Sequence, residues 1–385
     1  MRQDSFSEPS ETLANAAEVS VQHHHPRSMR HWSSRSRALL AGQEEQAGKL
    51  EGWGWWVLGV LALLALAVIS IGLGRYPLGA TKLLSGIVAA IIPHAGTHLS
   101  SIDVIVLEQI RLPRVLAAIM VGAALSGSGA AYQNMFRNPL VSPDILGVSA
   151  GAGFGASLGL FFNLPFAEVQ VLAFVGGVVS VVLTVGVAQV IGRGSTIVLV
   201  LAGIVIGAMA QALISLTQYF ANPTTTLPRI VFFLLGSLDN VTWSNNLWAP
   251  AVLVAISILM LFALRWPITV LAAGEDEART LGVNRRVVWS VVIVATTLMT
   301  ASVVAVAGIV GWVGLVVPHM ARYVVGPSFH RLLPASLLIG AFFLLAVDDI
   351  GRSAASIELP LGVLTALIGA PFFIALLARG RDQWR

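Results

Sequence analysis

The chain has no cysteine and few charged residues, and each shortage excludes a class of protein. Without cysteine it has no disulfide, no thiolate metal site and no thiol nucleophile. Only 11% of its 385 residues are Asp, Glu, Lys or Arg, whereas 56% are hydrophobic. A soluble domain carries about 25% charged residues. A chain this long with so little charge cannot cover a water-facing surface, so we expect lipid to solvate it.

Long hydrophobic runs recur along the chain, and a membrane-spanning helix needs roughly 20 apolar residues. The clear runs cover residues 55–71, 115–131, 169–191, 197–216, 247–264, 287–310, 332–347 and 361–378. Two less regular runs cover 140–162, which is rich in glycine and serine, and 311–325, which is short and contains Pro318. The sequence therefore predicts an all-α integral membrane protein of about ten transmembrane helices.

The basic residues indicate the orientation, because short cytoplasmic loops are enriched in Lys and Arg. With the N-terminus inside, more arginines fall on the inner side, and the outer segments keep Arg75, Lys82, Arg111, Arg114, Arg229 and Arg352. This favours an N-in/C-in topology, which an even number of spans requires. It also explains the net charge of +4 without a nucleic-acid partner. We expect a disordered cytoplasmic tail at 1–50, a polytopic membrane domain at 51–380 and a short cytoplasmic C-terminus at 381–385.

Small residues recur at helical spacing in two of the runs. Gly147, Gly151, Gly155 and Gly159 lie four residues apart, and Gly122, Ser126 and Ala130 do the same in the preceding run. In lipid such faces let helix backbones approach closely. The spacing predicts tight helix packing, with a glycine-lined translocation path as the alternative.

The longest predicted cytoplasmic loop, at about 268–286, has the pattern of a short helix. Acidic residues from Glu275 onward begin it, Arg279 lies in its last turn and Gly282 is placed to stop it. Ala278 and Leu281 are three residues apart and are expected to share a face. By its residues alone this is a solvated loop helix, or one that docks into the groove of a partner.

Several short motifs occur in a defined order. They are QIRLPR at 109–114, GAALSG at 122–127, FRNPL at 136–140, LGVSAGAG at 146–153, the loop at 274–282, GLVVPH at 314–319, ELPLGV at 358–363 and IGAP at 368–371. Together they resemble the permeases of bacterial iron-siderophore, haem and cobalamin importers, the FecCD family of type II ABC importers. The resemblance covers residues 55–379, and the first fifty residues lie outside it.

The resemblance implies the type II ABC importer permease fold and a set of partners. These are a second permease copy (the same chain or a paralogue), two cytoplasmic ATPase subunits and a periplasmic substrate-binding protein. The only Gly-Lys pair, Gly48-Lys49, is followed by Leu50 and not by Ser or Thr, so a phosphate-binding loop is absent. We therefore expect a transport subunit that is not an enzyme, with ATP and Mg on the partner ATPase and no cofactor or metal on this chain.

The resemblance also implies roles for individual residues. The residues expected to couple to the ATPase are Gly274, Glu275, Ala278, Arg279, Leu281 and Gly282. Those expected to form the cytoplasmic gate are Asn138, Pro139, Leu140, Ser195 and Thr196. Those expected to dock the binding protein are Arg111, Arg114 and Arg352. Local chemistry leaves alternatives open: ordinary turns for the gate loops, snorkelling for Arg111 and Arg114, and an internal salt bridge to Asp348 or Asp349 for Arg352.

The predicted function is the movement of an unaltered iron chelate from periplasm to cytoplasm by alternating access in the bacterial inner membrane. A ferric siderophore ranks first as cargo, haem second and cobalamin third. An ion-coupled secondary transporter would require charged residues inside the spans, whereas those of this chain cluster at the span ends. A membrane-embedded enzyme would require convergent catalytic or metal-binding side chains within the bilayer, and the sequence offers none.

Overall fold

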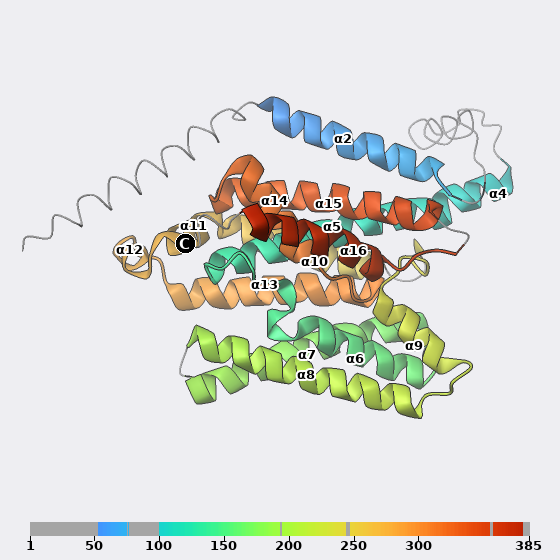
Figure 1. The fold of residues 1–385 in the computed structure, drawn as a ribbon, viewed down its shortest axis with the longest axis horizontal. Coiled ribbons are helices and arrows are strands. Elements are labelled where there is room, and N and C mark those ends of the chain that lie inside the picture. The colour runs from blue at the N-terminus through green and yellow to red at the C-terminus, as the bar shows by residue number, and fades with distance from the viewer. Residues whose placement is uncertain are drawn as a thin grey trace, which may run out of the picture. The chain divides into compact units, whose positions relative to one another are not determined.

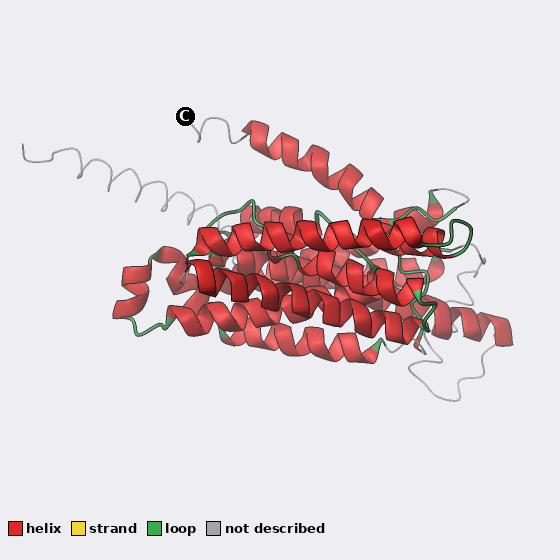
Figure 2. Ribbon diagram, turned by 90° about the horizontal axis from the view of Figure 1, so that it is seen from below, coloured by secondary structure: helices red, strands yellow, loops and turns green. Residues whose placement is uncertain are grey.

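The structure is a computed structural model that describes residues 53–74, 76, 100–192, 195–243, 247–354 and 357–379. The predicted tail at 1–50, most of the first outer loop and the C-terminus at 381–385 lie outside these residues. Within the described ranges every regular element is a helix (Figure 2). The expected all-α class is therefore confirmed.

The first half of the membrane domain contains four long helices, the shorter helix α6 and three short helical segments. In chain order they are α2 (Trp53–Gly72), α4 (Ser101–Val104), the π-helix η2 (Ile105–Arg111), α5 (Leu112–Met135), the 3-10 helix η3 (Pro143–Leu146), α6 (Val148–Phe161), α7 (Phe166–Gly192) and α8 (Thr196–Phe220).

The second half alternates long helices with short ones. In chain order they are α9 (Thr226–Leu235), α10 (Trp248–Ala263), α11 (Arg265–Ala273), α12 (Glu275–Thr280), α13 (Arg285–Ala307), α14 (Val313–Val325), α15 (Phe329–Ser353) and α16 (Leu361–Arg379). α16 ends toward the end of the bundle that carries α11 and α12, the end from which α2 starts (Figure 1).

The helices match the predicted spans in position but differ in length. Five described helices (α2, α7, α8, α13 and α15) are individually long and apolar enough to cross a membrane, and α10 with α11 forms a sixth candidate bent by 53°. The apolar helices α6, α14 and α16 are shorter. Each of the ten predicted runs nevertheless coincides with a helix. α9 was not predicted as a helix, because its ten residues include Pro228 and Arg229.

α13 lies at the centre of the bundle. It packs against α5 and α10 on one side and against α6 and α7 on the other (Figure 1), and 72% of its most apolar stretch is buried. The group α6, α7 and α8 is therefore joined to the rest of the membrane domain through this helix.

The two small-residue faces are helix–helix contacts. A Cβ atom on Gly155 of α6 would lie 2.0 Å from the Leu172 carbonyl oxygen of α7, and one on Gly122 of α5 would lie 2.1 Å from the Gly340 carbonyl oxygen of α15. Contacts this close require glycine. The predicted tight packing is confirmed, and the faces are occupied by neighbouring helices of the same chain rather than by a path.

The predicted irregularity near Pro318 is also present. α14 covers only Val313–Val325, and the residues before it form a non-helical strip with Gly308 at φ +70° and Trp312 at φ +69°. Inside a membrane protein such a strip must be covered by protein. Here the Ser237 amide donates to the Ala307 carbonyl at 2.9 Å, which joins the end of α13 to the segment after α9.

Candidate functional site

The loop helix predicted on the inner side forms as α12, and local hydrogen bonds explain where it ends. The Val283 amide donates to the Ala278 carbonyl at 2.8 Å, and the Gly282 amide donates to the Arg279 carbonyl at 3.0 Å. Gly282 has φ +75°. This is the Schellman pattern, in which a residue in the left-handed region terminates a helix. The predicted stop at Gly282 is confirmed.

The expectation that Ala278 and Leu281 share a face is wrong. Ala278 is 1% exposed and packs inward with Val283, whereas Leu281 is 57% exposed. The cap after Thr280 turns Leu281 away from the face that Ala278 buries. A partner can therefore contact Leu281 directly, while Ala278 holds α12 against the membrane domain. The coupling role of Gly274, Glu275 and the rest of this loop stays a prediction.

The first predicted gate loop, Asn138–Leu140, lies between α5 and η3. The Asn138 side chain accepts a hydrogen bond from the Leu140 amide at 2.9 Å, which holds the Asn-Pro turn closed. The preceding residue, Arg137, has φ +50°, and its guanidinium donates to the Leu271 carbonyl of α11. This contact ties the turn to the helix that leads into α12. The sequence places Arg137 in the FRNPL motif at 136–140 but does not predict this contact.

The second predicted gate loop lies between α7 and α8, and Gly194 in it is outside the described residues. Ser195 is the N-cap residue of α8 and Thr196 is its first residue. Arg285, at the start of α13, donates to the Thr196 hydroxyl at 3.3 Å, and its guanidinium carbon lies 4.6 Å from the centre of the Trp289 ring. The start of α8 is thus tied to the helix that follows the coupling loop.

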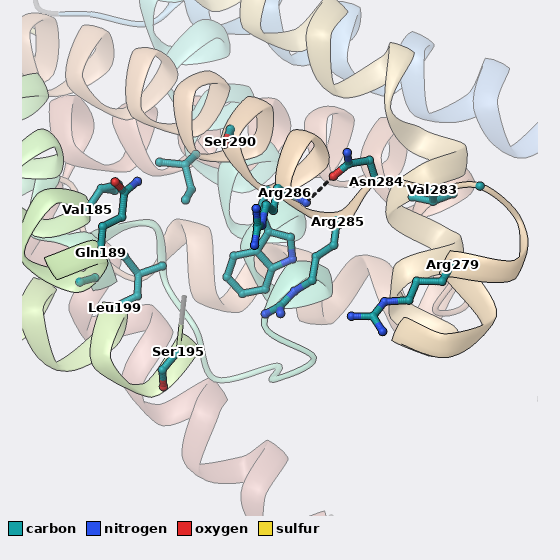
Figure 3. Close-up of a pocket in the computed structure, with 14 residues that line it drawn as sticks. Val185, Gln189, Ser195, Leu199, Arg279, Val283, Asn284, Arg285, Arg286 and Ser290 are labelled. Atoms are coloured by element: carbon teal, nitrogen blue, oxygen red, sulfur yellow. Dashed lines mark hydrogen bonds between the residues drawn. The ribbon is translucent and has the colours of Figure 1, made fainter. Parts of the chain in front are cut away.

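A pocket of about 1000 Å³ lies between the α7–α8 connection and the segment that joins α12 to α13 (Figure 3). We call it the inner pocket. It is lined by Val185, Ala188, Gln189, Ser195, Leu199, Arg279, Gly282, Val283, Asn284, Arg285, Arg286, Trp289, Ser290 and Ile293. It therefore joins one predicted gate residue, Ser195, with two predicted coupling residues, Arg279 and Gly282. The Asn138–Leu140 turn is not part of its lining.

At the outer end, Arg111 caps the C-terminus of α2. It is 4% exposed, and its guanidinium donates to the carbonyl oxygens of Ile71 at 2.6 Å, Gly72 at 3.0 Å and Tyr76 at 2.5 Å. The last carbonyls of a helix have no partner within the helix, so Arg111 supplies one. A buried residue with these partners does not snorkel.

Arg114 pairs with three carboxylates from distant parts of the chain. Its guanidinium lies 2.9 Å from Asp348 of α15, 3.1 Å from Asp239 and 2.9 Å from Glu358. The Asp348 side chain is fully buried, whereas those of Asp239 and Glu358 are 49% and 29% exposed. Arg114 thus holds together α5, α15 and the two outer loops.

Arg352 forms the internal salt bridge that the sequence left open as an alternative. Its Nε atom lies 3.1 Å from Asp348, its terminal nitrogen contacts Asp349, and it donates to the Ser70 hydroxyl at 2.7 Å. All three predicted docking arginines therefore have partners within the chain. Docking of a binding protein on them stays a prediction.

The pKa values of two carboxyl groups that pair with Arg114, those of Asp239 and Glu358, are shifted in opposite directions. Burial opposes ionisation of Asp239, but its hydrogen bond with Glu358 and the charge of Arg114 outweigh burial and lower its pKa. Burial and the same hydrogen bond raise the pKa of Glu358, against the opposing effect of Arg114. Of the two carboxyl groups, that of Glu358 therefore binds a proton more readily.

Comparison with known proteins places the chain among transport permeases. The model of the FecCD transport family matches residues 62–379. The molybdate import system permease protein MolB of Haemophilus influenzae is 37% identical over 82% of this chain and 93% of its own length. A Helicobacter pylori protein named as an iron chelatin transport system permease is 40% identical over 74% of this chain and 85% of its own length. Relatives named for hemin and vitamin B12 transport also match.

A solved structure shares the fold. It is described as an inward-facing conformation of a metal-chelate type ABC transporter, and it superposes with a TM-score of 0.72 at 35% identity, over 83% of this chain and 97% of its own. The helices of the described residues thus follow the arrangement of an ABC importer permease.

Proposed function

The chain belongs to the FecCD transport family, and on this premise we propose that it carries a ferric chelate, with a ferric siderophore as first choice, from the periplasm into the cytoplasm. As a member of that family it is a multi-pass membrane permease of an ABC importer, whose ATPase is a separate subunit. The proposal adds the cargo, the partners and the way in which this chain transmits the ATPase cycle.

The proposed assembly contains a second permease copy, two cytoplasmic ATPase subunits with ATP and Mg, and a periplasmic binding protein, in the bacterial inner membrane. α12 is the element that contacts the ATPase. Its end carries the exposed Leu281, and the buried Ala278 packs α12 against the membrane domain.

The observation that carries the proposal is that each predicted gate loop is tied by one arginine to the segment around α12. Arg137 joins the Asn138–Leu140 turn to α11, and Arg285 joins the start of α8 to the start of α13. α11 and α13 flank α12 on either side in the chain. A displacement of α12 by the ATPase would therefore pull on both gate loops at once, which is what alternating access requires.

The outer end offers a space that fits a chelate. A pocket of about 740 Å³, the outer pocket, is lined by Leu160, Phe166, Arg229, Phe232, Phe233, Ser237, Asp239, Asn240, Val306, Ala307, Ile357, Glu358, Leu359 and Pro360. Drug-sized ligands occupy pockets of roughly 300–1,000 Å³ lined by aromatic and a few polar groups. A bulky ferric chelate matches this size and mixed lining.

Molybdate is a second candidate cargo, because MolB is 37% identical over 320 residues. A small divalent oxyanion would need cationic or neutral donors. The outer pocket presents two carboxyl groups, Asp239 and Glu358, beside one cationic lining residue, Arg229, and Arg114 is already paired with both carboxyl groups. This favours a chelate over an oxyanion. Haem and cobalamin remain the alternatives of similar size.

The coupling step is tested with Arg137→Gln in the reconstituted transporter. Loss of the contact to Leu271 should lower the amount of cargo moved per ATP hydrolysed, while ATP hydrolysis itself continues. Arg265→Gln is the matched control. Arg265 is an inner-side arginine at the start of α11, and it contacts the Phe262 ring rather than a predicted gate loop. An unchanged ratio of transport to hydrolysis in Arg137→Gln would contradict the transmission route.

A further inference from the structure

The inner pocket has an uneven charge. Three of its lining residues, Arg279, Arg285 and Arg286, are cationic, and none of the described residues that line it is acidic. Asp276 and Glu277 of α12 are exposed but do not line this space. The pocket is therefore suited to an anion.

Two of the three arginines are available to a ligand. Arg279 and Arg286 are exposed, and their side chains make no ion pair or hydrogen bond with the side chains that the structure describes, among which that of Glu275 is not included. Arg285 lies deeper, between the Thr196 hydroxyl and the Trp289 ring. Figure 3 shows Arg279 and Arg285 extending into the space between the loop after α12 and the start of α8.

The opposite wall of the inner pocket is apolar and lies in the spans. Val185 of α7, Leu199 of α8 and Ile293 of α13 line it, with the half-buried Trp289 at its edge. The arginines thus lie at the cytoplasmic side of the inner pocket, and its apolar wall lies on the membrane side. Tryptophan is enriched at that boundary, and the α8 N-terminus at Ser195 adds partial positive charge at the same level.

We propose that the inner pocket binds an anionic phospholipid. The phosphate is held at Arg279 and Arg286, whose planar guanidinium groups suit bidentate contacts with phosphate, and an acyl chain lies along the apolar wall. Basic pockets between membrane helices on the cytoplasmic side are typical sites for anionic headgroups. A soluble anion would use the arginines but leave the apolar wall uncovered, so the pocket selects the lipid.

Such a lipid would connect two parts of the transporter. Arg279 belongs to the loop that is proposed to contact the ATPase, and Ser195 and Leu199 belong to the start of α8. The lipid would fill the space between them and hold the two together. The inference does not depend on the identity of the cargo, because the inner pocket and the outer pocket share no residue.

The test is native mass spectrometry of the full-length chain with phosphatidylglycerol and with phosphatidylcholine of the same acyl chains. The wild type should retain phosphatidylglycerol in preference to phosphatidylcholine. The double variant Arg279→Gln/Arg286→Gln should bind phosphatidylglycerol roughly 30-fold more weakly, about fivefold for each basic residue removed. Arg265→Gln, an inner-side arginine outside the pocket, should bind as the wild type does.

A photoactivatable phosphatidylglycerol gives a readout that does not depend on the variants. In the wild type its adducts should map to α7, α8 and the first turns of α13. Equal retention of both lipids by the wild type, or adducts that map elsewhere, would overturn the proposal. Displacement of the lipid by millimolar inorganic phosphate would also overturn it, since that result would show a site for a soluble anion.

Discussion

Replacing Gly155 by alanine tests the packing of the α6–α7 pair, at one of the two small-residue faces for which the sequence predicted tight packing. A Cβ atom at this position would lie 2.0 Å from the Leu172 carbonyl oxygen and 2.7 Å from its carbon. An ordinary contact of a Cβ atom is 3.4–4 Å. The obstacle is backbone, which cannot rotate away as a side chain does, so the two helices must separate by more than an ångström.

The expected loss of stability is about 1–3 kcal/mol, the range for overpacking in a close-packed interior. Association of helices in lipid depends on van der Waals contact rather than on water exclusion. Separating α6 from α7 therefore weakens contacts along the whole pair and not only at residue 155.

Gly186→Ala is the matched control, because Gly186 lies on α7 and an added Cβ atom would meet nothing within 4 Å. Alanine is the better helix former by about 1 kcal/mol, so this variant should be as stable as the wild type or slightly more so. The assay is thermal unfolding of each purified variant in the same detergent. Equal unfolding temperatures for Gly155→Ala and Gly186→Ala would refute the close packing described here.

Three further substitutions address the two ends of the bundle. Asp348→Asn leaves Arg114 and Arg352 without their shared buried carboxylate, and thermal unfolding should show a loss of about 3–5 kcal/mol; a loss below about 1 kcal/mol would mean that Asp348 is dispensable. Glu358→Gln removes a carboxyl whose pKa is raised in the folded protein, so protonation stabilises the wild type and this contribution is lost as pH rises through that pKa. The unfolding temperature of the wild type should therefore fall relative to Glu358→Gln from about pH 4.5 upward, and a pH-independent difference would exclude the raised pKa of Glu358. Gly282→Ala places a side chain at φ +75°, which costs about 1–2 kcal/mol, and should weaken stimulation of the ATPase in reconstituted vesicles; unchanged stimulation would separate the cap from coupling.

The positions of the spans could be predicted from the sequence because eight of the ten runs are clear stretches of apolar residues. α9 was missed because its ten residues are too few for a span and Pro228 and Arg229 interrupt the apolar pattern. It is held as a helix by tertiary packing: Ile230 is fully buried in a cluster with Ala156 and Leu160 of α6. A window of hydropathy carries no information about such a contact.

In the candidate sites, too, local interactions could be predicted from the sequence, whereas contacts between distant residues could not. The cap of α12 at Gly282 and the pairing of Arg352 with residues three and four positions before it were within reach of local sequence rules. The partners of Arg114 and Arg137 were not, because Asp348 is 234 positions from Arg114 and Leu271 is 134 positions from Arg137. Of two arginines with similar neighbours in the sequence, one can lie on the surface and the other can be buried and bind distant residues. Only the fold distinguishes them.

The most direct measurement is uptake by proteoliposomes that contain this chain, its partner ATPase and its binding protein. Labelled ferric siderophore, haem, cobalamin and molybdate are compared, each with and without ATP inside the vesicles. We expect uptake to require ATP and the ferric siderophore to accumulate fastest. Accumulation that proceeds without ATP, driven by a proton or sodium gradient, would contradict the assignment as an ATP-driven importer.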